Sequence, residues 1–201
     1  MVTVPAGGTA EQVEAFLKRH RRWVIRQVSR VEQRHAGLPK VWPYGSQLPY
    51  RGDAYEVIVR PGQPGRVERD ALRRELVVVT PSAGIAGARQ VLQRWLKQEA
   101  EPVLGEQVRV WGGRMGLQAK RVYVRNLRSK WGSCWPGGSL SFNYRLIMAP
   151  PGILDYVVIH ELAHLRQRNH STDFWAIVGE HAQDYQRARS WLRIFGPSLA
   201  I

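Results

Sequence analysis

The chain has 201 residues, which suits one domain or a domain with a small appendage. Its formal net charge of +14 comes mostly from arginine, as is typical of proteins that bind DNA or another polyanion and equally of a genomic bias toward arginine. The sequence has no run that could span a membrane, no secretory signal pattern at its start and only one cysteine, Cys134, so a disulfide within the chain is excluded and we expect a cytoplasmic protein.

The first part of the chain predicts one helix and a small β section. Thr9–Gln12 forms a capping-box pattern, which predicts a helix over residues 10–35 with an apolar stripe and a basic face. Residues 41–81 predict antiparallel β structure, because Tyr55–Arg60 and Leu76–Thr80 are rich in β-forming residues and turn signals separate them.

The rest of the chain alternates between helical and strand patterns. A long helix is expected over Gly87–Trp111, broken or kinked at Pro102 and ended by Gly112-Gly113. The strands expected next are Ala119–Arg125, Lys130–Trp135 and Leu140–Leu146. The helices expected after Pro150-Pro151 are Ile153–Leu165, Thr172–His181 and Asp184–Ile194.

This order of elements predicts an α+β fold in which one helix packs beneath a mainly antiparallel sheet. Residues 1–85 would form the N-terminal helix and small β section. Residues 86–201 would form the core, and the two parts could be one continuous domain.

The most informative motif is His160-Glu161-Leu162-Ala163-His164, which lies in an otherwise almost entirely apolar stretch. On a helix, His160 and His164 lie one above the other on the same face and can chelate one Zn²⁺. Glu161 is then placed to polarise a metal-bound water. Buried polar groups need partners, and a metal would satisfy both imidazoles.

A zinc site that keeps a position open for water needs a third protein ligand. His170 is the favoured candidate, but it would point away from His160 and His164 if the helix continued. The helix must therefore end, and Asn169 is the expected left-handed residue at its C-terminal end, with Arg166 and Arg168 in the last turn. Ser171 or Thr172 would cap the next helix. Glu180 and His181 are alternative ligands on that helix.

The segment before the metal helix is basic, since no acidic residue lies between Glu106 and Asp155. If this segment lines the cleft, the cleft is strongly positive. The basic residues of the segment are Arg109, Arg114, Lys120, Arg121, Arg125, Arg128, Lys130 and Arg145.

Several motifs in the second half of the chain resemble the YgjP-like (DUF45) zinc metallopeptidases, which are similar to the SprT and WLM groups of DNA-associated zinc proteases. These motifs are Arg128–Cys134, Leu140–Leu146, Asp155–His164, Asn169–Ser171 and Phe174-Trp175. The resemblance implies a zincin-like fold with Zn²⁺ held by His160, His164 and His170 and with Glu161 as base. It also implies that Leu140–Leu146 is the edge strand beside the cleft, where an extended peptide could pair. Gln167 stands where metzincins have a glycine.

The leading hypothesis is a zinc-dependent metallopeptidase in which Glu161 takes the proton of the zinc-bound water. Asn143, Arg145 and Tyr185 are candidates to stabilise the oxyanion. One alternative is a metal-dependent nucleotide phosphohydrolase of the nucleoside triphosphate pyrophosphatase type, with phosphates held by the basic cleft. The other is a non-enzymatic, basic nucleic-acid-binding protein with a structural zinc, which would need a fourth ligand from Glu180, His181 or Cys134.

Overall fold

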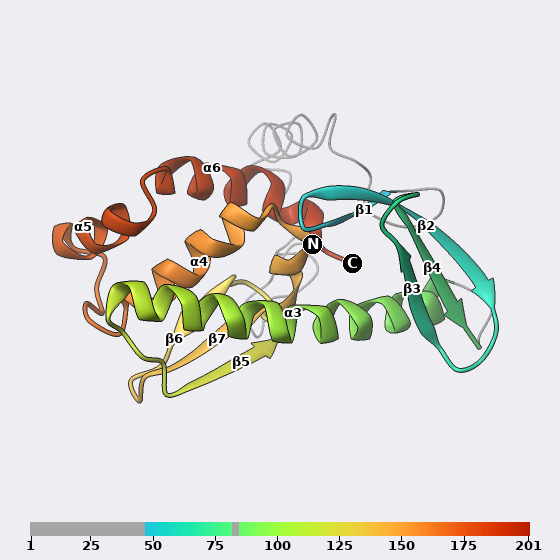
Figure 1. Cartoon of the computed structure of the whole chain (residues 1–201), viewed down its shortest axis with the longest axis horizontal. Helices are drawn as coiled ribbons and strands as arrows, with labels where there is room; N and C mark the ends of the chain where they lie inside the picture. The colour runs from blue at the N-terminus through green and yellow to red at the C-terminus, as the bar shows by residue number, and fades with distance from the viewer. Residues whose placement is uncertain (1–46, 82–84) are drawn as a thin grey trace, which may run out of the picture. The chain divides into compact units, whose positions relative to one another are not determined.

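The computed structural model describes residues 47–81 and 85–201, all of which belong to one compact unit, Pro39–Ile201. The helix predicted over residues 10–35 lies outside the described residues. Figure 1 shows the course of the chain.

The first sheet contains β1 (Gln47–Tyr50), β2 (Asp53–Pro61), β3 (Arg66–Asp70) and β4 (Glu75–Thr80) in the order β1-β2-β4-β3. A two-residue turn joins β1 to β2, and both of its residues have positive φ angles, 52° at Arg51 and 88° at Gly52, as a tight hairpin requires. The prediction of purely antiparallel structure is wrong for the central pair, because β2 and β4 run parallel. In the strand order, β3 pairs with one edge of β4, and β2 pairs with the opposite edge.

Helix α3 (Ile85–Met115) carries a buried stripe that contacts both sheets and the later helix α4 (Pro151–Ala163) (Figure 1). The stripe has a small or aliphatic residue at every fourth position from Ala88 to Gly112. The helix was expected to break or kink at Pro102; it does not break there, because Pro102 lies inside one continuous helix. The helix also continues past Gly112-Gly113 to Met115, because packing of the stripe outweighs the unfavourable propensity of proline and glycine.

The second sheet contains β5 (Arg121–Arg125), β6 (Gly132–Cys134) and β7 (Ser139–Asn143) in the order β5-β7-β6. Strand β7 is central, so the expectation that Leu140–Leu146 forms the edge strand is wrong; β6 lies at that edge. The strand ends at Asn143 because the side chain of Asn143 accepts a hydrogen bond from the backbone N–H of Arg145 and caps the 3₁₀ helix η1 (Tyr144–Met148).

Helix α4 is surrounded by protein, as its sequence predicted, and Leu154, Val158 and Leu162 are among its buried residues. It is followed by α5 (Thr172–His181), α6 (Tyr185–Phe195) and the 3₁₀ helix η2 (Gly196–Leu199). The described part of the chain is thus α+β with two mixed sheets, in which three of the five strand pairs are antiparallel and each sheet contains one parallel pair. Within residues 47–81 and 85–201, no helix combines the length and hydropathy needed to cross a membrane.

The two adjacent glycines near the end of α3 have opposite surroundings, which allows a matched test of packing. A Cβ atom on Gly112 would lie 2.6 Å from the carbonyl oxygen of Leu117, whereas one on Gly113 would meet nothing within 4 Å. We expect Gly112→Ala to lower the free energy of unfolding by about 1–3 kcal/mol through overpacking. Gly113→Ala should raise it by up to about 1 kcal/mol through helix propensity. Urea denaturation of both variants measures the difference, and equal effects would contradict the described helix end.

Candidate metal centre

Three imidazoles converge at the C-terminal end of α4. The ligand atoms of His160, His164 and His170 all lie within 4.8 Å of one another. The Nε2 atoms of His160 and His170 are 3.2 Å apart. Two nitrogens bound tetrahedrally to Zn²⁺ at about 2.05 Å would be separated by about 3.3 Å, so the observed spacing matches that of ligands that share one ion.

A turn after α4 returns the chain to His160. The helix ends at Ala163, and the backbone N–H groups of Leu165, Arg166 and Gln167 bond back to Leu162 and Ala163. Asn169 does not have a positive φ angle, and Arg166 lies beyond the helix, so the predicted helix end at residues 166–169 is wrong. These backbone bonds already satisfy the end of the helix, which removes the need for a left-handed residue.

Gln167 forms hydrogen bonds with residues at the start and at the end of this turn. Its carbonyl oxygen lies 3.1 Å from Nδ1 of His164, so Nδ1 carries the proton and Nε2 of His164 offers its lone pair to the site. The side chain of Gln167 donates a 2.9 Å hydrogen bond to Oγ of Ser171, the residue after His170. Ser171 is also the N-cap position of α5, as predicted, although its side chain makes no capping bond. Gln167 therefore links the orientation of His164 to the backbone beside His170.

Aromatic rings enclose the imidazoles. The ring of Phe174 lies between 4.5 and 4.9 Å from the rings of all three histidines, centroid to centroid. Trp175 stacks on His170 at 5.7 Å, and the hydroxyl of Tyr156 lies 3.5 Å from Nδ1 of His160. These contacts restrict how far each imidazole can rotate away from the common point.

Glu161 lies in the same cavity as the three histidines. The cavity has a volume of about 420 Å³ and is lined by residues of β6, α4 and the turn after α4. Glu161 is only 5% exposed. A Cβ atom on Gly132 would lie 2.5 Å from Cγ of Glu161, so the backbone of β6 touches this side chain directly. A residue larger than glycine at position 132 would have to displace Glu161.

Burial shifts the ionisation of these groups in the protein without a metal ion. Burial, reinforced by the neighbouring imidazoles of His164 and His170, lowers the pKa of His160 to about 3. Burial also lowers the pKa of His164. It raises the pKa of Glu161 to about 8, against the opposing charge of Lys130. The imidazoles of His160 and His164 are therefore neutral at pH 7, which is the form that binds a metal.

The donor set fits a nitrogen-seeking transition metal. Zn²⁺ is commonly held by three imidazoles with a further position open, whereas Mg²⁺ and Ca²⁺ require oxygen ligands. Within the described residues, only the three histidines form a cluster of potential metal ligands. The residues present thus suit zinc better than the hard cations.

Asn143 and Arg145 do not line the cavity. Asn143 is fully buried, and its amide nitrogen donates hydrogen bonds to the carbonyl oxygens of Leu127 at 2.7 Å and Lys130 at 3.1 Å. Arg145 donates to the same carbonyl of Leu127 at 2.8 Å. Both side chains therefore hold the loop that precedes β6.

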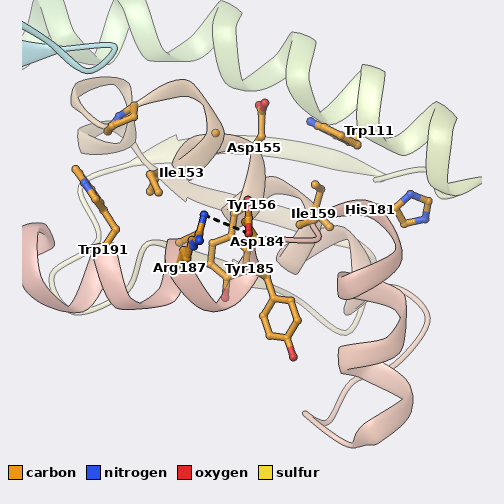
Figure 2. Close-up of a pocket in the computed structure, with 14 residues that line it drawn as sticks. Trp111, Ile153, Asp155, Tyr156, Ile159, His181, Asp184, Tyr185, Arg187 and Trp191 are labelled. Atoms are coloured by element: carbon orange, nitrogen blue, oxygen red, sulfur yellow. Dashed lines mark ion pairs between the residues drawn. The ribbon is translucent and has the colours of Figure 1, made fainter.

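Tyr185 and His181 line a second cavity of about 440 Å³, on another side of α4 (Figure 2). The ring of Tyr185 stacks on Trp175 at 5.1 Å and so supports the aromatic enclosure of His170 from behind. Glu180 is exposed and lies 3.9 Å from His181. Neither alternative ligand belongs to the histidine cluster.

Sequence reasoning missed the roles of Gly132 and Gln167. An isolated glycine within a strand pattern indicates a close approach of the backbone to another group, and this signal could have identified Gly132. Gln167 carries no such signal, because its role depends on which of its atoms face His164 and Ser171.

Comparison with known proteins gives one family match and one similar solved structure. No curated protein matches the chain. Among solved structures, the crystal structure of a metallopeptidase zymogen, abylysin of Pyrococcus abyssi, is similar at 22% sequence identity with a TM-score of 0.39, and the match covers 45% of this chain and 93% of that chain. The model of the family described as YgjP-like, metallopeptidase domain, matches residues 1–195. This match includes all three histidines and Glu161.

Removal of one imidazole tests the centre. We expect His170→Ala to weaken zinc binding by at least about 100-fold, which exceeds the roughly 10–100-fold lost when a partner of a ligand is removed. His181→Ala is the matched control, since His181 lies in the other cavity and should leave binding unchanged. Zinc titration with a competing chelator measures both affinities. Normal zinc binding by His170→Ala would remove His170 from the ligand set.

Proposed function

Since the chain belongs to the YgjP-like metallopeptidase family, we propose that it is a zinc-dependent peptidase with a zincin-like fold. His160, His164 and His170 would hold the ion, and Glu161 would act as the general base. The observation that carries this proposal is the convergence of three imidazoles beside one buried carboxylate. This arrangement provides the ligands and the proton acceptor that hydrolysis of a peptide bond requires.

A zinc ion held there would supply a Lewis acid that lowers the pKa of water and polarises the scissile carbonyl. Glu161 would accept a proton from the attacking water and deliver it to the leaving amine. Its low exposure and its contact with the backbone of Gly132 keep the carboxyl group in one place. A positive ion nearby would also favour the ionised carboxylate that a base must be.

The edge strand β6 supports a peptide substrate. Trp131 and Trp135 use their backbone groups to pair with β7, through bonds of 2.8 Å to Asn143 and 2.9 Å to Ser139. Because backbone groups alternate in direction along a strand, those of Gly132 and Cys134 face away from β7. No described strand occupies that side of β6. An extended peptide could pair there and pass the histidines and Glu161 in the same cavity.

The two alternative functions fit less well. A magnesium-dependent phosphohydrolase would need carboxylate ligands, and the cluster contains only imidazoles. A structural zinc site would need a fourth protein ligand, and no fourth residue of the described chain joins the three histidines. Binding of DNA to the basic surface and a relation to the SprT and WLM proteases remain predictions.

Replacement of the proposed base separates chemistry from metal binding. We expect Glu161→Gln to retain one zinc per chain, because the imidazoles are untouched, and to lose turnover by at least about 100-fold. Glu180→Gln makes the same chemical change at an exposed position and should keep full activity. Zinc analysis together with mass spectrometry of a digested peptide library gives both readouts. Unchanged turnover by zinc-loaded Glu161→Gln would exclude Glu161 as the base.

The contact between β6 and the base provides a second test. Gly132→Ala should displace Glu161 and reduce turnover by about 100-fold, the loss expected for a misplacement of about 1 Å, while zinc content stays normal. Gly137→Ala is the control in the turn that follows, because a Cβ atom there meets nothing within 4 Å. Steady-state assays of the two variants on one peptide decide the outcome. Full activity of Gly132→Ala would mean that the described position of Glu161 is not the active one.

A further inference from the structure

The charged groups of the site cavity are distributed unevenly. Glu161 is the only acidic residue that lines it, and this group lies buried at the back. Lys130 and Arg168 are the two residues of the lining that carry a fixed positive charge, and both are exposed. Lys130 precedes β6, and Arg168 donates a 2.7 Å hydrogen bond to the carbonyl oxygen of Pro136, which follows β6. The free edge of β6 therefore has one cation at each end.

Neither cation is neutralised by the described part of the protein. The ion pairs found within residues 47–81 and 85–201 include neither Lys130 nor Arg168. The bond from Arg168 to Pro136 fixes the direction of the guanidinium group but carries no negative charge. The backbone of Lys130 is likewise fixed, since its carbonyl oxygen accepts a hydrogen bond from the buried Asn143. The guanidinium group of Arg168 and the backbone of Lys130 are thus held at the two ends of β6, and neither cation forms an ion pair among those of the described residues.

The charges also act inside the cavity. Lys130 lines the cavity together with Glu161 and partly opposes the effect of burial, which still raises the pKa of Glu161. Arg168 likewise opposes the effect of burial on the thiol of Cys134. Both side chains are thus close enough to act on groups that line the proposed substrate path.

We infer that the cleft selects peptides with acidic side chains on both sides of the scissile bond, and that Lys130 and Arg168 are the residues that determine this specificity. This inference rests on the proposed peptidase function. Lys130 and Pro136, the residue to which Arg168 is bonded, are six residues apart along the chain, so the two acidic side chains of a peptide beside β6 would lie at most about six residues, or about 20 Å, apart. The free strand edge favours a peptide over a nucleic acid, because it offers backbone hydrogen bonds.

The first test compares substrates. A parent peptide that wild-type protein cleaves would be made in three forms, with Glu, Gln or Lys at two positions about six residues apart that span the scissile bond. We expect kcat/KM to fall by about 2–5-fold for each Glu→Gln change, as for exposed ion pairs, and further for Lys. The preference should weaken as salt is added. Equal rates for all three peptides would overturn the inference.

The second test assigns the preference to the two cations. Lys130→Gln and Arg168→Gln should each remove the advantage of Glu at one of the two peptide positions only. At the position that Arg168→Gln affects, Arg168→Glu should make the Lys peptide the better substrate. Arg166→Gln is the matched control, because Arg166 is an exposed arginine of the same turn that does not line the cavity. An undiminished preference in both Gln variants would overturn the assignment.

A binding readout keeps the inference distinct from the proposed hydrolysis. Cys134 is the only cysteine of the chain and lines the cavity, so alkylation of its thiol by iodoacetamide reports occupancy of the cleft. In zinc-loaded Glu161→Gln protein, the Glu peptide should protect Cys134 at about 2–5-fold lower concentration than the Gln peptide for each position.

If the Glu peptide protects Cys134 of the Glu161→Gln protein better than the Gln peptide does, but the wild-type protein hydrolyses neither peptide, the acidic preference is upheld and the proposed peptidase function fails. Stronger protection by an oligonucleotide of equal charge would overturn the peptide assignment and identify a polyanion site. Equal protection by both peptides would overturn the preference itself.

Discussion

The functional site depends on one constraint: an exposed histidine must reach two histidines on a mostly buried helix. His160 lies in α4 and His164 is the C-cap residue of α4, which neighbouring helices and strands surround. His170 reaches them only because the helix ends at Ala163 and the following turn is closed by its own backbone hydrogen bonds. Without this turn, the three nitrogens would not lie within 4.8 Å of one another. His160 and His164 are partly buried, and a cation bound between them would satisfy ring nitrogens that water reaches less easily there.

The second sheet packs against this helix through β6, and the closest approach is between Gly132 and Glu161. Gly132 lets the backbone of β6 approach the side chain of Glu161 more closely than any other residue would allow. The same strand therefore limits the position of the proposed base and presents its outer edge to the cavity. Asn143 supports the arrangement from the far side, since it holds the carbonyls of Leu127 and Lys130 just before β6. The proposed peptide-binding edge and the proposed base are thus positioned by the same strand.

Features with strong local signals could be predicted from the sequence. The bounds Thr172–His181 of α5 are confirmed, and the buried environment of α4 followed from its apolar run. Features that depend on distant contacts could not be predicted. The parallel pairing of β2 with β4, and the central place of β7, result from which edges α3 and the other strands leave free. Turn signals in the sequence describe how neighbouring residues along the chain fold, and they do not indicate which strand pairs with which free edge.

The cluster of three histidines could be predicted only in part, because one part of it depends on local spacing and the other on distant contacts. The spacing of His160 and His164 is a helical repeat and can be read locally. The return of His170 requires a turn whose geometry the sequence indicated wrongly at Asn169. The bracing by Gln167 depends on tertiary hydrogen bonds alone.

The shortness of β6 has a consequence for the solution behaviour of the protein. An unpaired strand edge is a template for aggregation, and long flat edges are a hazard in any sheet protein. With three residues, of which Gly132 and Cys134 turn their backbone groups outward, β6 presents only a short edge, and short edge strands limit edge-to-edge pairing between sheets. The like charges of Lys130 and Arg168 at its ends would also repel such a copy. Within the described part of the chain, the free edge of β6 is thus both short and flanked by two positive charges, two features that oppose pairing with a second copy.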